Sequence, residues 1–265
     1  MELSSVLFKE NFRLSNDAFM YVFDNIKETC PYQLSSSISP MLKLCCILRF
    51  LAHESYQQTV GNDFILGFAQ PTVSLILNEK LPILETTICS LWIKTDISEQ
   101  HKQLTRRKFY TNSGVPNLVG CVDGTHVAII APSENRHLYL NRKGFFSINA
   151  MIACDHDMVI RCVDARYGSS HDSFVGDHNS VYLDILGDSG YPLHEYLWTP
   201  YRNALSGTVE SQFIKKHAKP RNVVESTIGV LKCRFRCILG ERKLRYSPSK
   251  ATMIINVCCA LHNIC

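Results

Sequence analysis

The chain has 265 residues, 46% of them hydrophobic, and a formal net charge of +4, so it can form one large domain or two small ones with a substantial core. Many of its twelve cysteines lie inside apolar runs such as "LKLCCILRFLA", which indicates buried thiols in a reducing compartment and argues against a disulfide-stapled scaffold. The apolar runs are interrupted before about 18 residues and the N-terminus has no signal-peptide pattern, so neither a membrane span nor secretion is expected.

The positive charge is concentrated in one segment. Residues 213–245 contain ten Lys and Arg residues and only two acidic residues, so the rest of the chain is mildly acidic. A strongly basic segment of this kind is a candidate site for a polyanion such as DNA. The alternative interpretation is a solvated helix face.

Residues 1–110 are predicted to be helical. Ser15 and Ser39 are typical N-cap residues, and Pro40 follows Ser39 at a favoured first helical position. Around residues 57–81, a short helix, a turn near Gly67 and a second helix opening at Pro71 resemble a helix-turn-helix unit. Such trihelical units are also common as plain packing modules. Pro82 is expected to end or kink the second helix.

Residues 97–117 are polar and end in glycine and proline, so we interpret them as a linker. We therefore predict a helical N-terminal region at 1–110 and a second domain at 118–265. From residue 118 the hydrophobic period changes to that of strands. Five strand candidates follow, within 118–130, 145–155, 158–168, 181–188 and 195–201, with a hairpin turn at 155–158.

A long amphipathic helix is predicted over residues 220–240. Its apolar residues recur at spacings of four and three, and this stripe consists of Val224, Ile228, Leu231, Phe235 and Ile238. Three antiparallel strands followed by strands that alternate with helices indicate an α/β fold with a mixed five-stranded sheet flanked by helices.

Asp123 stands in the middle of the first strand candidate, where aspartate is disfavoured and an ionised carboxylate needs a partner. Other acids follow at element ends, namely Asp172 in "GSSHDS", Asp188 in "LGDSGYP" and Glu225 in the basic helix. Converging carboxylates are hard oxygen ligands that select Mg²⁺ or Mn²⁺, and two such ions about 3.5–4 Å apart can clamp a phosphodiester displacement. Asp172 could instead cap a helix.

Several other polar residues have plainer interpretations. Asp155 and Asp157 are interpreted as turn residues, and His126 and His171 as structural. In the basic helix, Glu225, Gly229, Lys232 and Arg236 are spaced to share one stripe, so the acid is expected beside two cations. The neighbouring cations would hold a DNA backbone without reading its sequence.

Five motifs occur in the order found in PIF/Harbinger transposases, and the chain resembles the domesticated Harbinger transposase-derived nucleases in particular. These motifs are "GCVDGTHVAI", "YLNRKGFFSINAMIACD", "GSSHDS", "LGDSGYP" and "KPRNVVESTIGVLKCRFR". The resemblance implies an RNase H-like DDE endonuclease domain with a divalent metal cofactor, Mg²⁺ or Mn²⁺. It implies Asp123, Asp188 and Glu225 as the catalytic acids, with Asp172 as a further metal ligand.

The resemblance also bears on nucleic-acid contacts and partners. Asn141, Arg142 and Lys143 match the family's "NRKG" loop and are interpreted as support or phosphate contacts. Arg142 and Lys143 are thus predicted DNA-binding residues, and the basic helix supplies Arg221, Lys232 and Arg236 to the same set. A separate Myb/SANT-like protein is the expected partner, and the nucleus, with some protein in the cytoplasm, is the expected location.

The sequence therefore predicts a metal-dependent DNA endonuclease of the DDE transposase type. The alternative is a catalytically silent domesticated transposase that acts as a DNA-binding or adaptor protein with a Myb-like partner. A metabolic metallohydrolase is disfavoured, because it would leave the basic helix without a purpose.

Overall fold

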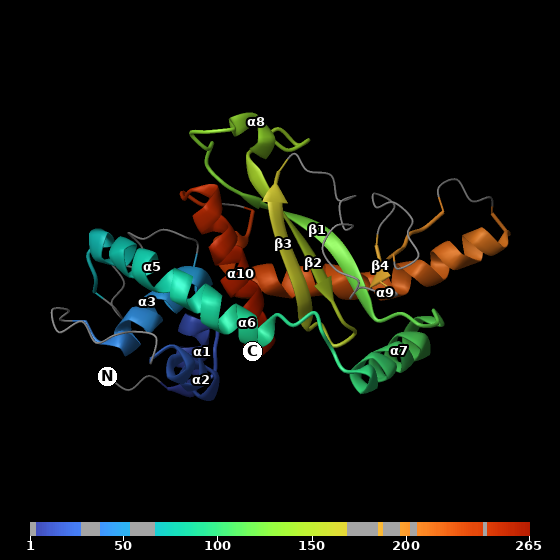
Figure 1. Ribbon diagram of the computed structural model, residues 1–265, viewed down its shortest axis with the longest axis horizontal. Coiled ribbons are helices and arrows are strands. Elements are labelled where there is room, and N and C mark those ends of the chain that lie inside the picture. Colours follow the sequence, from blue (N-terminus) through green and yellow to red (C-terminus); the bar gives the residue numbers. More distant parts are fainter. Residues whose placement is uncertain are drawn as a thin grey trace. The chain divides into compact units, whose positions relative to one another are not determined.

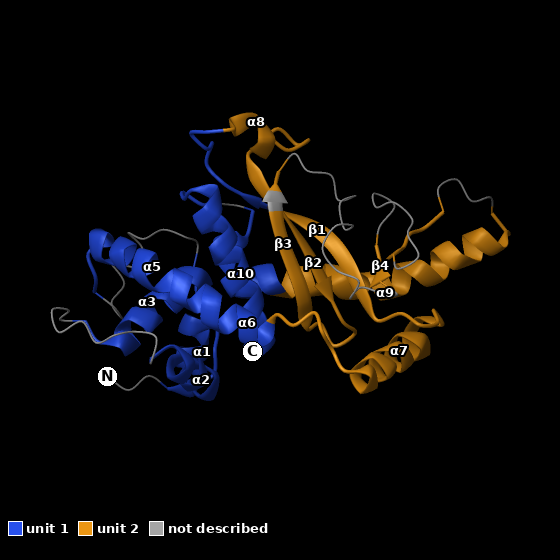
Figure 2. Cartoon of the chain, viewed as in Figure 1, with its two compact units in different colours: residues 1–92, 127–134, 231–265 blue, residues 93–126, 135–230 orange. Residues whose placement is uncertain are grey.

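The computed structural model describes residues 4–27, 38–53, 67–168, 185–187, 197–201, 206–240 and 243–265. Contacts within the chain divide it into two units (Figure 2). Unit 1 comprises residues 1–92, 127–134 and 231–265, and unit 2 comprises residues 93–126 and 135–230. Among the described residues, no helix is both long enough and apolar enough to cross a lipid bilayer.

Unit 1 is made mainly of helices from both ends of the chain. They are α1 (Ser5–Phe12), α2 (Asn16–Lys27), α3 (Pro40–Ala52), α5 (Gln70–Leu84), the π-helical turn η1 (Glu85–Cys89), α6 (Ser90–Trp92), the 3₁₀ turn η2 (Arg236–Ile238) and α10 (Pro248–Ile264). The side chains of Ser15 and Ser39 accept hydrogen bonds from the backbone N–H groups of Ala18 and Leu42, at 3.2 and 3.3 Å. Both predicted N-caps are confirmed.

The second helix of the predicted helix-turn-helix-like unit is present as α5. Gly67 adopts a left-handed φ of +60°, but the predicted first helix lies mostly outside the described residues, so the turn and the helix-turn-helix-like unit stay predictions. The helix does not end at Pro82, which was one of the two predicted outcomes, and the other, a kink there, stays a prediction. It continues through η1, where the N–H of Glu85 donates to the carbonyls of both Leu81 and Pro82.

The C-terminal helix α10 belongs to unit 1. It is buried along most of its length, and Asn256 donates a 2.7 Å hydrogen bond to Glu85, while Asn263 donates to the carbonyl of Trp92 at 3.0 Å. The two units therefore follow contacts and not chain order, and they do not coincide with the predicted ranges 1–110 and 118–265. The predicted domain boundary stays a prediction.

Unit 2 holds a mixed five-stranded sheet, as the sequence predicts (Figure 1). The strands are β1 (Gly120–Ala128), β2 (Ser147–Cys154), β3 (Ile160–Tyr167), β4 (Ile185–Leu186) and β5 (Leu197–Trp198), in the order β3-β2-β1-β4-β5. β2 and β3 are antiparallel, whereas β4 is parallel to both β1 and β5. The predicted hairpin turn between β2 and β3 is confirmed, because the N–H of Met158 donates to the carbonyl of Asp155.

Residues 97–117 are not a linker, because most of them form helix α7 (Glu99–Ser113). The side chain of Ser98 accepts a hydrogen bond from the N–H of His101, and Gly114 ends the helix in a left-handed conformation. Phe109 is fully buried in a core cluster of unit 2. The mean hydropathy of this segment is low because only one stripe of the helix is buried, and the packing of that stripe stabilises the helix.

The predicted basic helix is present, but with different bounds. Helix α9 spans Val209–Arg234, so it begins eleven residues before the predicted start and includes Pro220. It ends before Phe235, and η2 follows. Val224 and Leu231 are fully buried, which confirms these two positions of the apolar stripe. A short helix, α8 (Arg136–Tyr139), completes unit 2.

Candidate active site

Strand β1 directs Asp123 toward helix α9. Cys121, two residues earlier and therefore on the same face of the strand, donates its Sγ–H to the carbonyl of Pro220 at 3.1 Å. The side chain of Asp123 is 19% exposed. Its Oδ1 accepts a 2.9 Å hydrogen bond from the N–H of Gly124, which fixes the carboxylate and leaves Oδ2 toward the helix.

Helix α9 brings Arg221 and Glu225 to the same place, because the two residues are one turn apart. The Nη2 atom of Arg221 lies 3.6 Å from Oδ2 of Asp123 and 3.3 Å from Oε1 of Glu225. Asp123 and Glu225, distant in the sequence, therefore converge on one guanidinium nitrogen. Two of the acids predicted for the site thus lie close together, with a cation between them.

A core cluster supports this arrangement from below. It joins Phe109 of α7, Cys121 of β1, Leu186 of β4 and Val224 of α9, all fully buried. Cys121 and Val224 are near neighbours in the chain of Asp123 and Glu225, respectively, so the packing that fixes strand against helix also fixes the two carboxylates. Burial raises the pKa of the Cys121 thiol well above its usual range, so this residue is a neutral core group and not a thiolate ligand.

Asp172, Asp188 and His171 lie outside the described residues. The strand that precedes Asp188, β4, pairs next to β1, with Leu186 opposite Cys121. Within the described ranges, no group of three or more His, Cys, Asp or Glu side chains could hold a metal ion. The four-acid ligand set therefore stays a prediction, of which the structure describes Asp123 and Glu225.

The predicted DNA-binding cations fall into different environments. Arg142 and Lys143 are exposed in the turn before β2, as a phosphate contact requires. Arg221 faces the two acids. Lys232 is half-buried in α9, and Arg236 is exposed in η2. Because α9 ends at Arg234, the predicted helical stripe from Glu225 to Arg236 is interrupted, and among the residues that the structure describes Arg221 is the cation paired with Glu225.

Asn141 organises the turn that carries Arg142 and Lys143. Its buried side-chain oxygen accepts hydrogen bonds from the N–H groups of Lys143 and Phe145, at 2.9 and 3.2 Å, and its amide donates to Ser147 at 2.9 Å. This confirms a supporting role for Asn141. His126, on β1, has its Nδ1 3.0 Å from the Ser147 hydroxyl, in agreement with its structural interpretation.

Asp155 has a larger role than the turn residue that the sequence predicts. Its Oδ1 accepts from the N–H groups of Asp157 and Val159, as a turn requires. Its Oδ2 also accepts two hydrogen bonds from Arg161, at 2.7 and 2.9 Å, and lies 3.3 Å from Nε2 of His101. Asp155 is 1% exposed, so this network ties α7 to the β2–β3 hairpin. The spacing of Arg161 six residues later gave no local signal of the pairing.

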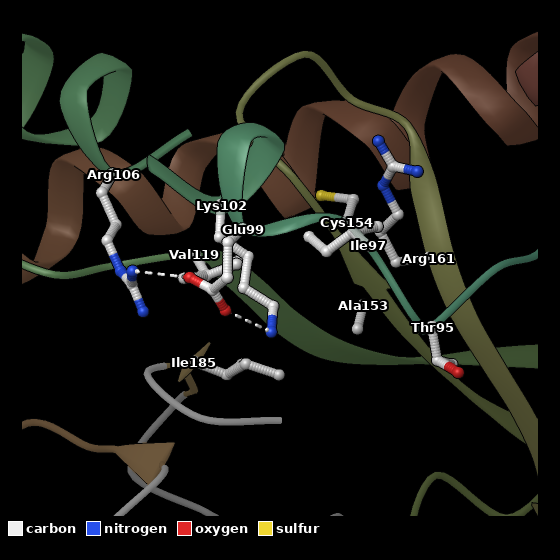
Figure 3. A pocket seen from close by; sticks show the side chains of 11 residues that line it. Thr95, Ile97, Glu99, Lys102, Arg106, Val119, Ala153, Cys154, Arg161 and Ile185 are labelled. Carbon is white, nitrogen blue, oxygen red and sulfur yellow. Dashed lines mark hydrogen bonds and ion pairs between the residues drawn. The ribbon is translucent and has the colours of Figure 1, made fainter. Parts of the chain in front are cut away.

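Unit 2 also has a cavity of about 60 Å³ (Figure 3). Thr95, Ile97 and α7 form one part of its wall, and the ends of β1 and β2 with Arg161 and Ile185 form another. Figure 3 shows Lys102 and Arg106 directed at Glu99, and the corresponding distances are 3.0 and 3.8 Å. Neither Asp123 nor Glu225 lines this cavity, so it is separate from the acid pair.

Comparison with known proteins agrees with this fold. Residues 122–263 match the family described as DDE superfamily endonuclease, and the chain belongs to this family. The proteins named "Putative nuclease HARBI1" from Rattus norvegicus and Homo sapiens are each 33% identical over 247 residues, which is 88% of this chain and 69% of theirs. "Protein ALP1-like" from Arabidopsis thaliana is 27% identical, over 97% of this chain and 70% of its own length. No solved structure matches the chain.

The family membership confirms the PIF/Harbinger resemblance that the sequence motifs indicate, together with an α/β fold of the RNase H-like DDE type. The matched range begins one residue before Asp123 and includes all of α9 and most of α10. It therefore contains the acid pair, the sheet except for the first two residues of β1, and the helix that carries Glu225.

Proposed function

We propose that the chain is a divalent-metal-dependent DNA endonuclease derived from a transposase. The observation that carries this proposal is the convergence of Asp123 and Glu225 on one cation, within a domain of the DDE endonuclease family. The nuclease named among the relatives supports the same reaction class. DNA is the substrate that this class implies.

The two described acids fit a magnesium or manganese ion. Mg²⁺ in phosphoryl-transfer sites is usually held by one or two carboxylates, with waters and substrate phosphates in the remaining positions. Asp123 and Glu225 supply hard oxygen donors, and Asp123 is already oriented by the Gly124 N–H. Asp188 and Asp172 are the proposed additional ligands.

In this proposal each residue has a defined task. The acids hold the cofactor and orient it, and exposed cations such as Arg142 and Lys143 bind the DNA backbone through its phosphates. A bound divalent ion supplies Lewis acidity at the phosphodiester and lowers the pKa of water. The core cluster beneath Cys121 and Val224 keeps the carboxylates in place, so little reorganisation is needed during reaction.

A nicking assay tests the proposal. Supercoiled plasmid is incubated with Mg²⁺ or Mn²⁺ and the full chain, as wild type, Asp123→Asn, Glu225→Gln or Asp188→Asn. We expect wild type to nick the plasmid and each variant to nick it at least about 100-fold more slowly. Each substitution removes a carboxylate that would hold the ion, and the ion stabilises the charge of the transition state. Glu210→Gln is the control, since Glu210 is an exposed acid in the first turn of the same helix. Equal nicking by wild type and Asp123→Asn would refute the proposal.

We also propose that the protein works in the nucleus, with some in the cytoplasm, beside a Myb/SANT-like protein that supplies sequence-specific DNA binding. The Harbinger resemblance supports this arrangement. The test is a gel shift at several salt concentrations, with and without a Myb-like partner. Tight, salt-resistant binding by this chain alone, without cleavage, would instead favour the catalytically silent adaptor.

A further inference from the structure

Arg221 lies between Asp123 and Glu225, the two described acids of the proposed metal site. Its Nη2 atom contacts both Asp123, at 3.6 Å, and Glu225, at 3.3 Å. Because both oxygens are within reach of one nitrogen, they can be no further apart than these two distances together. The exposed fractions of the side chains are 31% for Arg221, 19% for Asp123 and 48% for Glu225. The ion pair of Arg221 with Asp123 is therefore better shielded from water than its ion pair with Glu225.

The charges explain why a cation is needed there. Two neighbouring carboxylates repel, and a half-buried one such as Asp123 is costly without a positive partner. Without a metal ion, the side chains of Asp123, Glu225 and Arg221 together carry one net negative charge. With one divalent ion bound, the three side chains and the ion together carry one net positive charge, which attracts a phosphate.

A metal ion on these oxygens would compete with the guanidinium. Mg²⁺ binds its oxygen ligands at about 2.0–2.1 Å, closer than Nη2 now lies to either oxygen, and the two cations repel each other. Arg221 has a flexible side chain that is only partly buried, at 31% exposed, so it can turn away without unfolding the helix.

We propose that Arg221 is an exchangeable counter-ion of this site. In the metal-free protein it holds Asp123 and Glu225 together. When a divalent ion binds, the guanidinium leaves the acids and binds a phosphate of the DNA. This inference rests on the proposed metal site and adds that metal binding and DNA binding are coupled through one side chain.

The first test measures Mn²⁺ binding to the full chain without DNA, by calorimetry or by the electron paramagnetic resonance signal of free Mn²⁺. Arg221→Gln removes the competing cation, and we expect it to bind Mn²⁺ about fivefold more tightly than wild type, as the loss of two ion pairs of ordinary strength implies. Arg221→Lys keeps a charge and is expected to stay within about twofold of wild type.

Lys219→Gln is the matched control. Lys219 is exposed in the same helix, two residues before Arg221, and in the described part of the chain it makes no ion pair with Asp123 or Glu225. Lys219→Gln therefore changes the net charge by the same amount as Arg221→Gln but leaves the ion pairs of Arg221 with the two acids in place. If Lys219→Gln and Arg221→Gln change Mn²⁺ affinity equally, the effect is general electrostatics and the exchange is refuted.

Asp123→Asn distinguishes failure of the exchange from failure of the proposed metal site. Loss of Mn²⁺ binding in Asp123→Asn, with Arg221→Gln behaving like Lys219→Gln, overturns only the exchange. Unchanged Mn²⁺ binding in Asp123→Asn, or no binding by any protein in the series, overturns the proposed metal site and the exchange with it. Circular dichroism melting confirms that each variant is folded.

The second test measures DNA affinity with and without Ca²⁺, used as an ion that supports binding in place of Mg²⁺. With Ca²⁺, we expect Arg221→Gln to bind duplex DNA more weakly than wild type, with a salt slope smaller by about one, because one phosphate contact is lost. Without Ca²⁺ the two proteins should bind alike, since the guanidinium is then held by the acids. Equal weakening under both conditions would overturn the exchange.

Discussion

The placement of helix α7 predicts the effect of replacing Phe109 by alanine. Phe109 is fully buried, packs in the cluster that contains Cys121 and Val224, and meets the ring of His156 edge-to-face at 5.1 Å. Truncating a buried phenylalanine costs about 3–5 kcal/mol, the sum of lost transfer energy and the cavity left behind. The aromatic contact with His156 contributes about 0.5–1.5 kcal/mol beyond its buried area, which favours the upper half of that range.

Urea denaturation of the full chain, followed by circular dichroism and by hydrogen exchange of peptides from β1 and α9, measures this effect. Tyr110→Ala is the control, because Tyr110 is the next residue of the same helix and is 60% exposed, and we expect it to change stability by less than about 1 kcal/mol. Phe109→Ala should also speed exchange in β1 and α9, since the cluster joins them. If both variants lose the same small amount, residues 97–117 act as a linker and our account of unit 2 is wrong.

Three further predictions concern the surroundings of the site. Asp155→Ala should destabilise the protein by about 3 kcal/mol in the same urea titration, because it leaves the Arg161 charge and two backbone N–H groups without their acceptor. Asp157 forms an exposed ion pair with Lys108, so Asp157→Ala should cost less than about 1 kcal/mol. The hydrogen bond from Lys108 holds the pKa of Asp157 below its usual range. The stability that this pair contributes is therefore present above about pH 4 and is lost as the pH falls through the lowered pKa. Lys108→Gln should thus be less stable than wild type at pH 6 and as stable as wild type near pH 2. Burial raises the pKa of Cys154 to about 12, so at pH 8 iodoacetamide should alkylate the exposed Cys233 long before Cys154, and comparable labelling of the two by mass spectrometry would contradict the buried position of Cys154.

Local sequence signals were enough to place many of the elements. The strand periods, the N-cap serines and the turn after β2 act over a few residues, and each is present in the structure. Asp123 could also be singled out from sequence, because an aspartate inside a strand requires a partner. The i, i+4 spacing of Arg221 and Glu225 is equally visible in the sequence, although the basic segment around Arg221 favours a DNA contact.

Contacts between distant segments decided the rest. Residues 97–117 look like a linker by composition, and only the packing of Phe109 shows that they form part of unit 2. In the same way, α10 joins the N-terminal helices of unit 1, which no local pattern could indicate.

The sequence by itself determined which residue types are available for chemistry and where the strands and the basic helix lie approximately, because these depend on side-chain chemistry and on short-range periodicity. Only the tertiary structure decided that Arg221 lies between Asp123 and Glu225, since that requires β1 and α9, distant in the chain, to pack through Cys121 and Val224. Burial of apolar surface drives that packing and is not directional, so the partner of each charge is settled only when the core has formed.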